Sequence, residues 1–208
     1  EIALRPHAKT HKCAALGRLQ LAAGAAGLCC AKLGEAEALA AEGVGPLLIT
    51  SPLVGARKLA RLAHLALHAP GLAVVVDDVA QAEALALAMA AAGPVVDVLV
   101  DVDPGMARTG CATIDAALAV GRAVDGAPDL RLRGVQCYAG TIQHLADAGT
   151  RAEAARGVHR HLRATLAAFA AAELPLEVVT GSGTGTFALD AGAGLFTELQ
   201  VGSYLVMD

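Results

Sequence analysis

Residues 176–186 read LEVVTGSGTGT, an apolar β-favouring run that leads directly into a turn with glycine at alternate positions. Such glycines let backbone N–H groups turn toward one point, and the serine and threonine hydroxyls add donors, which is typical of a phosphate cradle. The turn lies late in the chain, whereas the glycine-rich fingerprint of a Rossmann fold follows the first strand. In a (β/α)8 barrel, phosphate commonly binds at the loops after the seventh and eighth strands. The stretch therefore favours a barrel over a doubly wound sheet.

The rest of the chain supplies the alternation of strands and helices that a barrel requires. Most connections between the apolar runs carry a helical pattern, with polar residues on one face and Ala or Leu on the other. The predicted strands are residues 2–9, 27–32, 46–50, 72–76, 95–102, 130–138, 176–180 and 198–207. The predicted helices are residues 34–42, 55–68, 79–92, 114–124 and 151–172. We therefore expect one α/β domain over residues 1–208, a TIM-type barrel without its last helix.

Composition excludes several classes of function. Hydrophobic residues make up 55% of the chain and aromatic residues only 2%, which indicates a core of Ala, Leu and Val. Charged residues make up 17% with a net charge of −4, so no basic surface for nucleic acid is expected. No apolar run reaches the roughly 18 residues of a membrane span, and no secretory signal pattern is present. Five scattered cysteines favour a reducing cytoplasm over a disulfide framework.

Residues 5–13 read RPHAKTHKC and place Lys9 at the end of a predicted strand, among two histidines and a second lysine. Like charges nearby disfavour the protonated form of a lysine, which makes its amine a better nucleophile. A lysine of this kind can form a Schiff base with an aldehyde cofactor. The alternative is a solvated, basic strand end with no chemical role.

Polar residues also follow the fifth predicted strand. Arg108 comes after a Pro-Gly turn that could return it to the mouth of the barrel. There, an arginine can donate hydrogen bonds to a phenolic oxygen or a carboxylate and stabilise its anionic form. The alternative is a surface ion pair with Asp101 or Asp103.

The sixth and eighth predicted strands end in further candidates. His144 lies just past the sixth strand, close to Tyr138, and a loop histidine can act as a general base or remain merely solvated. The eighth segment adds a second Gly-Ser step and a tyrosine, residues 202–204. Four histidines in helical stretches are interpreted as structural or surface residues: His64, His68, His159 and His161.

Taken together, these motifs resemble a known family. A lysine after the first strand, an arginine after the fifth and phosphate loops after the seventh and eighth resemble the alanine-racemase-type barrel of pyridoxal 5′-phosphate (PLP) enzymes of fold type III. Within that group, the chain is similar to the D-threonine aldolase and D-serine dehydratase branch. The segments that carry this likeness are residues 5–12, 29–37, 180–186 and 198–208.

The resemblance implies a role for each candidate residue. Lys9 would hold the cofactor as a Schiff base, with Lys12 as a neighbouring charge. Arg108 would donate to the phenolic oxygen of the cofactor, and His144 would deprotonate the β-hydroxyl group of the substrate. The residues that would surround the ring or phosphate are Tyr138, Ser182, Gly183, Thr184, Gly202, Ser203 and Tyr204.

The resemblance further implies a cytoplasmic lyase that cleaves D-threonine, or a related β-hydroxy-D-amino acid, to glycine and an aldehyde. Three alternatives stay open: a D-serine dehydratase that releases a 2-oxo acid and ammonia, a 3-hydroxy-D-aspartate aldolase, and a non-catalytic PLP-binding protein. A 3-hydroxy-D-aspartate aldolase would need an extra cationic group to bind the side-chain carboxylate of its substrate. The expected partners are a small D-amino acid and a second copy of the chain in a homodimer, with no nucleic acid and no membrane.

A divalent cation is implied as well. Members of the branch carry a C-terminal β domain whose His-x-Asp or His-x-Cys pair binds Mn²⁺ in aldolases and Zn²⁺ in dehydratases. The chain ends at Asp208, so this domain and these ligands are expected in a longer parent protein. No metal ligand is predicted within the chain itself.

Overall fold

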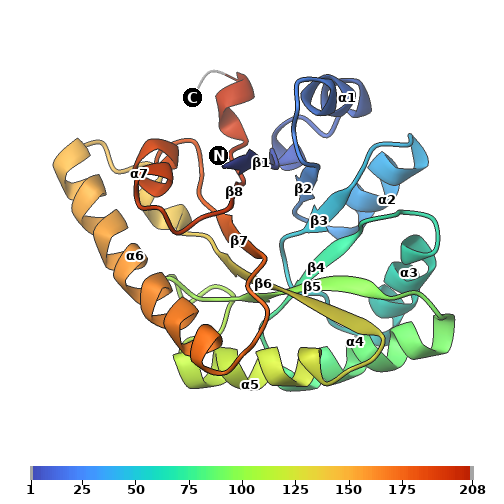
Figure 1. Cartoon of the computed structure of the whole chain (residues 1–208). Coiled ribbons are helices and arrows are strands. Elements are labelled where there is room, and N and C mark those ends of the chain that lie inside the picture. Colours follow the sequence, from blue (N-terminus) through green and yellow to red (C-terminus); the bar gives the residue numbers. More distant parts are fainter. Residues whose placement is uncertain (1, 207–208) are drawn as a thin grey trace.

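The computed structural model of the chain describes residues 2–206, in which eight parallel strands form one curled sheet (Figure 1). The strands are β1 (Ala3–Leu4), β2 (Leu28–Cys30), β3 (Leu47–Ile49), β4 (Ala73–Val76), β5 (Val96–Asp101), β6 (Leu130–Cys137), β7 (Val178–Gly181) and β8 (Glu198–Leu199). Their order in the sheet is β1-β8-β7-β6-β5-β4-β3-β2. Consecutive strands are therefore neighbours, as right-handed βα units around a barrel require.

The sheet closes where its first two strands meet. Beyond β1, His7 forms an isolated parallel bridge with Cys29 of β2, and the Cys29 N–H group donates to the Pro6 carbonyl at 2.8 Å. The other edge of β1 pairs with β8, with Ala3 opposite Glu198. Because both ends of the sheet meet in this way, the predicted (β/α)8 barrel is confirmed.

Helices cover the outside of the strands in an arc (Figure 1). They are α1 (Ala14–Ala22), α2 (Leu33–Ala41), α3 (Ala56–Ala66), α4 (Val79–Ala92), α5 (Ile114–Asp125) and α6 (Ala148–Ala171), with the short α7 (Phe187–Gly192) after β7. Side-chain oxygens of Asp78, Thr113 and Asp147 accept from backbone N–H groups and start α4, α5 and α6. No helix among residues 2–206 is both long and apolar enough to cross a membrane.

Apolar packing occurs on both faces of the sheet. The larger core lies between the strands and the helices and consists mainly of Val, Leu and Ala side chains. A small second cluster fills part of the barrel interior: Cys29, Leu48, Val75 and Leu99. Polar side chains occupy the interior next to it, where Gln200 Nε2 donates to Gln136 Oε1 at 3.0 Å and to Thr180 Oγ1 at 3.1 Å. The interior thus turns from apolar to polar toward the carboxyl ends of the strands.

Two helices, α1 and α7, were not predicted, and the strands predicted over 2–9 and 198–207 are much longer than those in the structure. Residues 14–22, which carried no prediction, form α1. The first predicted strand stops at Leu4, because Pro6 has no N–H group for a ladder and residues Ala8–Thr10 turn into the 3-10 helix η1. The strand predicted over 198–207 stops at Leu199, and Ser203–Val206 form the 3-10 helix η3. Residue 207 lies outside the described part of the chain.

Candidate active site

Two adjoining cavities open among the carboxyl ends of the strands. The larger has a volume of about 410 Å³ and the smaller about 210 Å³. Both are lined by His7, Lys9, Tyr138 and Gln200, so they meet at Lys9. Seven of the predicted site residues line the larger cavity: Lys9, Tyr138, His144, Gly183, Thr184, Gly202 and Ser203. Sequence segments from opposite ends of the chain are thus brought to one place.

Lys9 sits on η1 and faces Tyr138. Its Nζ atom lies 5.3 Å from the centroid of the Tyr138 ring, and the guanidinium carbon of Arg108 lies 5.6 Å from the same centroid. Burial and the positive charge of Arg108 lower the pKa of Lys9. The predicted direction is confirmed, but burial is the larger cause and the neighbouring cation is Arg108, whereas Lys12 pairs with Glu35 at 3.7 Å.

His7 is neutral and holds the turn that carries Lys9. Burial, followed by the charge of Lys9, lowers the pKa of His7 to about 3. Its Nε2 atom lies 3.1 Å from Thr50 Oγ1, and that hydroxyl donates to the Cys30 carbonyl, so we place the imidazole proton on Nε2. The free Nδ1 atom then accepts from the Lys9 N–H group at 3.4 Å. His7 therefore holds the turn at Lys9 through the hydrogen bonds of its neutral ring and adds no positive charge to the site.

Residues 181–186, the predicted phosphate loop, need glycines at some positions because another backbone segment packs closely against them. A Cβ atom at Gly181 would lie 2.0 Å from the Cys137 carbonyl oxygen, and one at Gly185 would lie 2.1 Å from that of Gln143. The left-handed backbone falls instead on Ser182, with φ of 73°. Alternate glycines thus let the loop lie directly against the end of β6.

This loop and the loop after β8 both contribute backbone N–H groups to the wall of the larger cavity. Among the described residues, the backbone N–H groups of Gly183, Thr184 and Gly202 have no hydrogen-bond acceptor. Thr184 Oγ1 accepts from the Tyr204 N–H group at 3.0 Å, which leaves its own proton available. Unpaired N–H groups that converge on one cavity are suited to an anion such as a phosphate.

Arg108 lines the smaller cavity, on a loop folded by Asp103. The Asp103 carboxylate accepts from the N–H groups of Gly105, Met106 and Ala107 at 2.6–3.3 Å. Within the described residues, Arg108 forms no ion pair with Asp101 or Asp103. The surface ion pair considered from the sequence is therefore not what holds this arginine.

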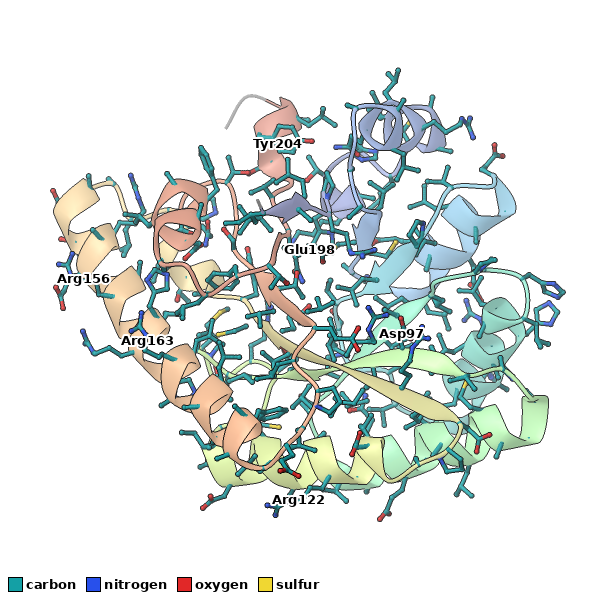
Figure 2. The ribbon with its side chains drawn as sticks, viewed as in Figure 1. Asp97, Arg122, Arg156, Arg163, Glu198 and Tyr204 are labelled. Atoms are coloured by element: carbon teal, nitrogen blue, oxygen red, sulfur yellow. The ribbon has the colours of Figure 1, made fainter. Side chains whose placement is uncertain are left out.

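The remaining candidates are placed differently. His144 follows the 3-10 helix η2 (Gly140–Ile142), is exposed, and lines the larger cavity. Ser182 is buried with its hydroxyl toward the Gly183 carbonyl, and the Tyr204 phenol accepts from Gln20 Nε2 at 2.8 Å. Neither Ser182 nor Tyr204 lines a cavity, and Figure 2 shows Tyr204 on η3 at the margin of the barrel.

Five residues of the larger cavity were not among the predicted site residues: His7, Thr10, Gln143, Gly185 and Gln200. Each belongs to or adjoins a segment already singled out from the sequence. Position near a strand end, and not residue type, could therefore have identified them. Residues 2–206 hold no group of three His, Cys, Asp or Glu side chains that could bind a metal ion. The site thus combines a nucleophilic amine, a guanidinium group, an imidazole ring and an anion cradle.

Comparison with known proteins matches this geometry. Residues 3–208 match the family described as alanine racemase, N-terminal domain. The chain is 38% identical over 208 residues to a D-threonine aldolase of Arthrobacter sp, covering 100% of this chain and 55% of that protein. It is 34% identical over 205 residues to a 3-hydroxy-D-aspartate aldolase of Paracoccus denitrificans (strain Pd 1222), covering 98% and 53%.

A solved structure agrees with these sequence relatives. The crystal structure of D-threonine aldolase from Filomicrobium marinum superposes with a TM-score of 0.97 at 44% identity, covering 100% of this chain and 56% of that one. The chain therefore spans about half the length of the relatives it matches.

Proposed function

The chain belongs to the alanine racemase N-terminal domain family, and from this premise we propose a PLP-dependent lyase that cleaves D-threonine or a related β-hydroxy-D-amino acid to glycine and an aldehyde. The observation that carries the proposal is the convergence of Lys9, Arg108, His144 and the glycine-rich loop on two joined cavities.

The residues present fit PLP. The unpaired N–H groups of Gly183, Thr184 and Gly202 would hold its phosphate. The amine of Lys9 has a lowered pKa and would hold the aldehyde carbon. Arg108 lines the smaller cavity beside the Tyr138 ring and would donate to the phenolic oxygen. The phosphate, the aldehyde carbon and the phenolic oxygen of the cofactor thus each have a partner of matching chemistry.

When bound, PLP supplies an electron sink for the negative charge that develops at the substrate Cα. Burial and the charge of Arg108 lower the pKa of the Lys9 amine, which favours its neutral, nucleophilic form. The His144 imidazole would take the proton from the β-hydroxyl oxygen of the substrate, and loss of this proton allows the Cα–Cβ bond to break. The Lys9 amine and the Arg108 guanidinium group both lie against the Tyr138 ring, 5.3 and 5.6 Å from its centroid, so this ring helps to position both side chains.

We propose that a divalent cation, Mn²⁺ or Zn²⁺, orients the β-hydroxyl group and lowers its pKa. The described residues hold no cluster that could bind such an ion, so its ligands would come from the part of the relatives that this chain does not span. We also propose a homodimer and a cytoplasmic location, the latter supported by five free thiols.

The charges at the cavities favour a neutral β-substituent over 3-hydroxy-D-aspartate. Among the described residues that line the cavities, the basic side chains are His7, Lys9, Arg108 and His144. His7 is neutral, and the other three have roles in the proposed reaction. None is left for a second substrate carboxylate.

The deciding experiment is product analysis after incubation of the full-length protein with D-threonine, PLP and Mn²⁺. We expect glycine and acetaldehyde, with loss of covalent PLP in Lys9→Ala (borohydride trapping and peptide mass spectrometry). His144→Gln should keep the covalent cofactor while kcat falls roughly 10²- to 10⁴-fold. 2-Oxobutanoate and ammonia would make the protein a dehydratase, and covalent PLP without any turnover would make it a cofactor-binding protein.

A further inference from the structure

A buried chain of polar side chains runs from the outside of the barrel to the residue that precedes His144. His159 of α6 lies 2.7 Å from Asp190 of α7, measured from Nε2 to Oδ1. The second Asp190 oxygen accepts from the Thr186 hydroxyl at 2.6 Å. Thr186 Oγ1 in turn accepts from Gln143 Nε2 at 3.0 Å. All four side chains are buried, with exposed fractions of 8% or less.

The donors and acceptors of this chain fit one arrangement. As a carboxylate, Asp190 accepts at both oxygens, so the Thr186 hydroxyl proton points to Asp190 and its lone pair faces the Gln143 amide. The His159 ring lies edge-on to Phe196, with centroids 6.2 Å apart, which fixes the outer end of the chain. Hydrogen bonds to a buried carboxylate are short and strong. Asp190 therefore orients the Thr186 hydroxyl, and this hydroxyl in turn orients the Gln143 amide.

Gln143 is the point where the chain reaches the candidate site. Its Nε2 group also donates to the Ala139 carbonyl at 3.0 Å, and its Oε1 atom accepts from the Gly185 N–H group at 3.0 Å. A Cβ atom at Gly183 would lie only 2.6 Å from Oε1, so the amide lies directly against the phosphate loop. One side chain therefore clamps the loop and the backbone that carries His144.

We propose that Thr186 and Asp190 are positioning residues, which hold Gln143 so that the phosphate loop and His144 keep one fixed relation. This inference rests on the proposed function for the role of His144. Neither residue lines the two cavities, so an effect on the cofactor or substrate must pass through Gln143 or through the backbone of the loop that ends at Thr186. Placement errors of about 1 Å at a reacting group cost up to roughly 100-fold in rate, which gives such a clamp a kinetic consequence.

The test uses Thr186→Val, which keeps the shape of the side chain and removes its hydroxyl group. The matched control is Thr165→Val on α6, where an equally buried hydroxyl donates to the His161 carbonyl and takes no part in the clamp. We expect kcat for D-threonine to fall roughly 10- to 100-fold in Thr186→Val with KM changed much less, and PLP affinity to fall about tenfold. Thr186→Ser should restore both quantities.

Hydrogen–deuterium exchange gives a readout that does not depend on turnover. In Thr186→Val, backbone amides of residues 140–145 and 183–186 should exchange faster than in the wild type, whereas Thr165→Val should leave them unchanged. If Thr186→Val does not fold, Asp190→Asn provides a second break in the same chain of hydrogen bonds and should show the same pattern.

The two proposals can fail separately. If the wild type releases no glycine from D-threonine, the proposed function fails, and the clamp is judged on PLP affinity and amide exchange alone. The clamp is overturned if Thr186→Val keeps wild-type affinity and exchange in these segments, or if Thr165→Val changes them by the same amount.

Discussion

At the scale of single residues, Asp101 carries a buried charge beside the smaller cavity. Burial raises the pKa of its carboxyl group from 3.8 to about 6, although Gln136 Nε2 donates to it at 2.9 Å. Between these pH values the folded state binds more protons than the unfolded state, so this residue makes stability fall as the pH rises. The loss is complete above about pH 6 and is on the order of 3 kcal/mol.

Asp101→Asn should remove this pH dependence, because an amide does not titrate. Between pH 4 and pH 8, the wild type should lose on the order of 3 kcal/mol of unfolding free energy relative to the variant. Urea unfolding at both pH values measures this difference. Asp125→Asn, at an exposed carboxylate at the end of α5, serves as the control. If the free energy of unfolding changes with pH equally in the wild type and in Asp101→Asn, burial does not raise the pKa of this carboxyl group.

At the scale of an element, the loop between β5 and α5 depends on one side chain. Asp103 accepts from three consecutive backbone N–H groups, and Ala107, next to Arg108, has a φ of 52° that such bonds help to hold. Asp103→Ala removes these acceptors, so Arg108 should lose its fixed place over the Tyr138 ring. We expect PLP affinity to fall about tenfold in a fluorescence titration. Asp125→Ala should bind as the wild type does, and equal affinity in all three proteins would contradict this role.

Elements were predictable where local pattern and tertiary packing agree. The helices α2 to α6 follow from alternating polar and Ala/Leu faces, and the strands β2 to β7 from apolar runs. η3 was not predictable, because Tyr204 favours a strand by itself but is bound through its N–H group to Thr184 and through its phenol to Gln20. Contacts between residues far apart in the sequence decide this segment.

At the scale of the whole molecule, the barrel followed from the order of its parts, since a glycine-rich turn after the seventh strand fits no common alternative. The site was predictable to the level of which strand ends meet: Lys9, Arg108, His144 and Gly183 do line joined cavities. The buried clamp was not, because His159 of α6 and Gln143 after η2 lie far in sequence from the Thr186–Asp190 pair at the start of α7, and no sequence spacing reveals that they share an interior.

The barrel as a whole is joined across its first and last strands by a buried ion pair. Arg5 Nε lies 2.9 Å from Glu198 Oε1, with side chains 16% and 6% exposed, and Thr180 Oγ1 donates to the same Glu198 oxygen at 3.0 Å. Figure 2 shows Glu198 in the interior, whereas Arg156 lies on the outer side of α6. Removing one partner of such a pair leaves an uncompensated charge, which typically costs about 3–5 kcal/mol.

Glu198→Gln should therefore lower the free energy of unfolding by about 3–5 kcal/mol in urea. Arg5→Met combined with Glu198→Met should recover most of this loss, because an apolar pair leaves no buried charge behind. Glu153→Gln, which breaks the exposed pair with Arg156, should cause no measurable change. If Glu198→Gln proves as mild as Glu153→Gln, closure of the barrel rests on the backbone ladders and the apolar core, and the ion pair contributes only to the register of β1 and β8.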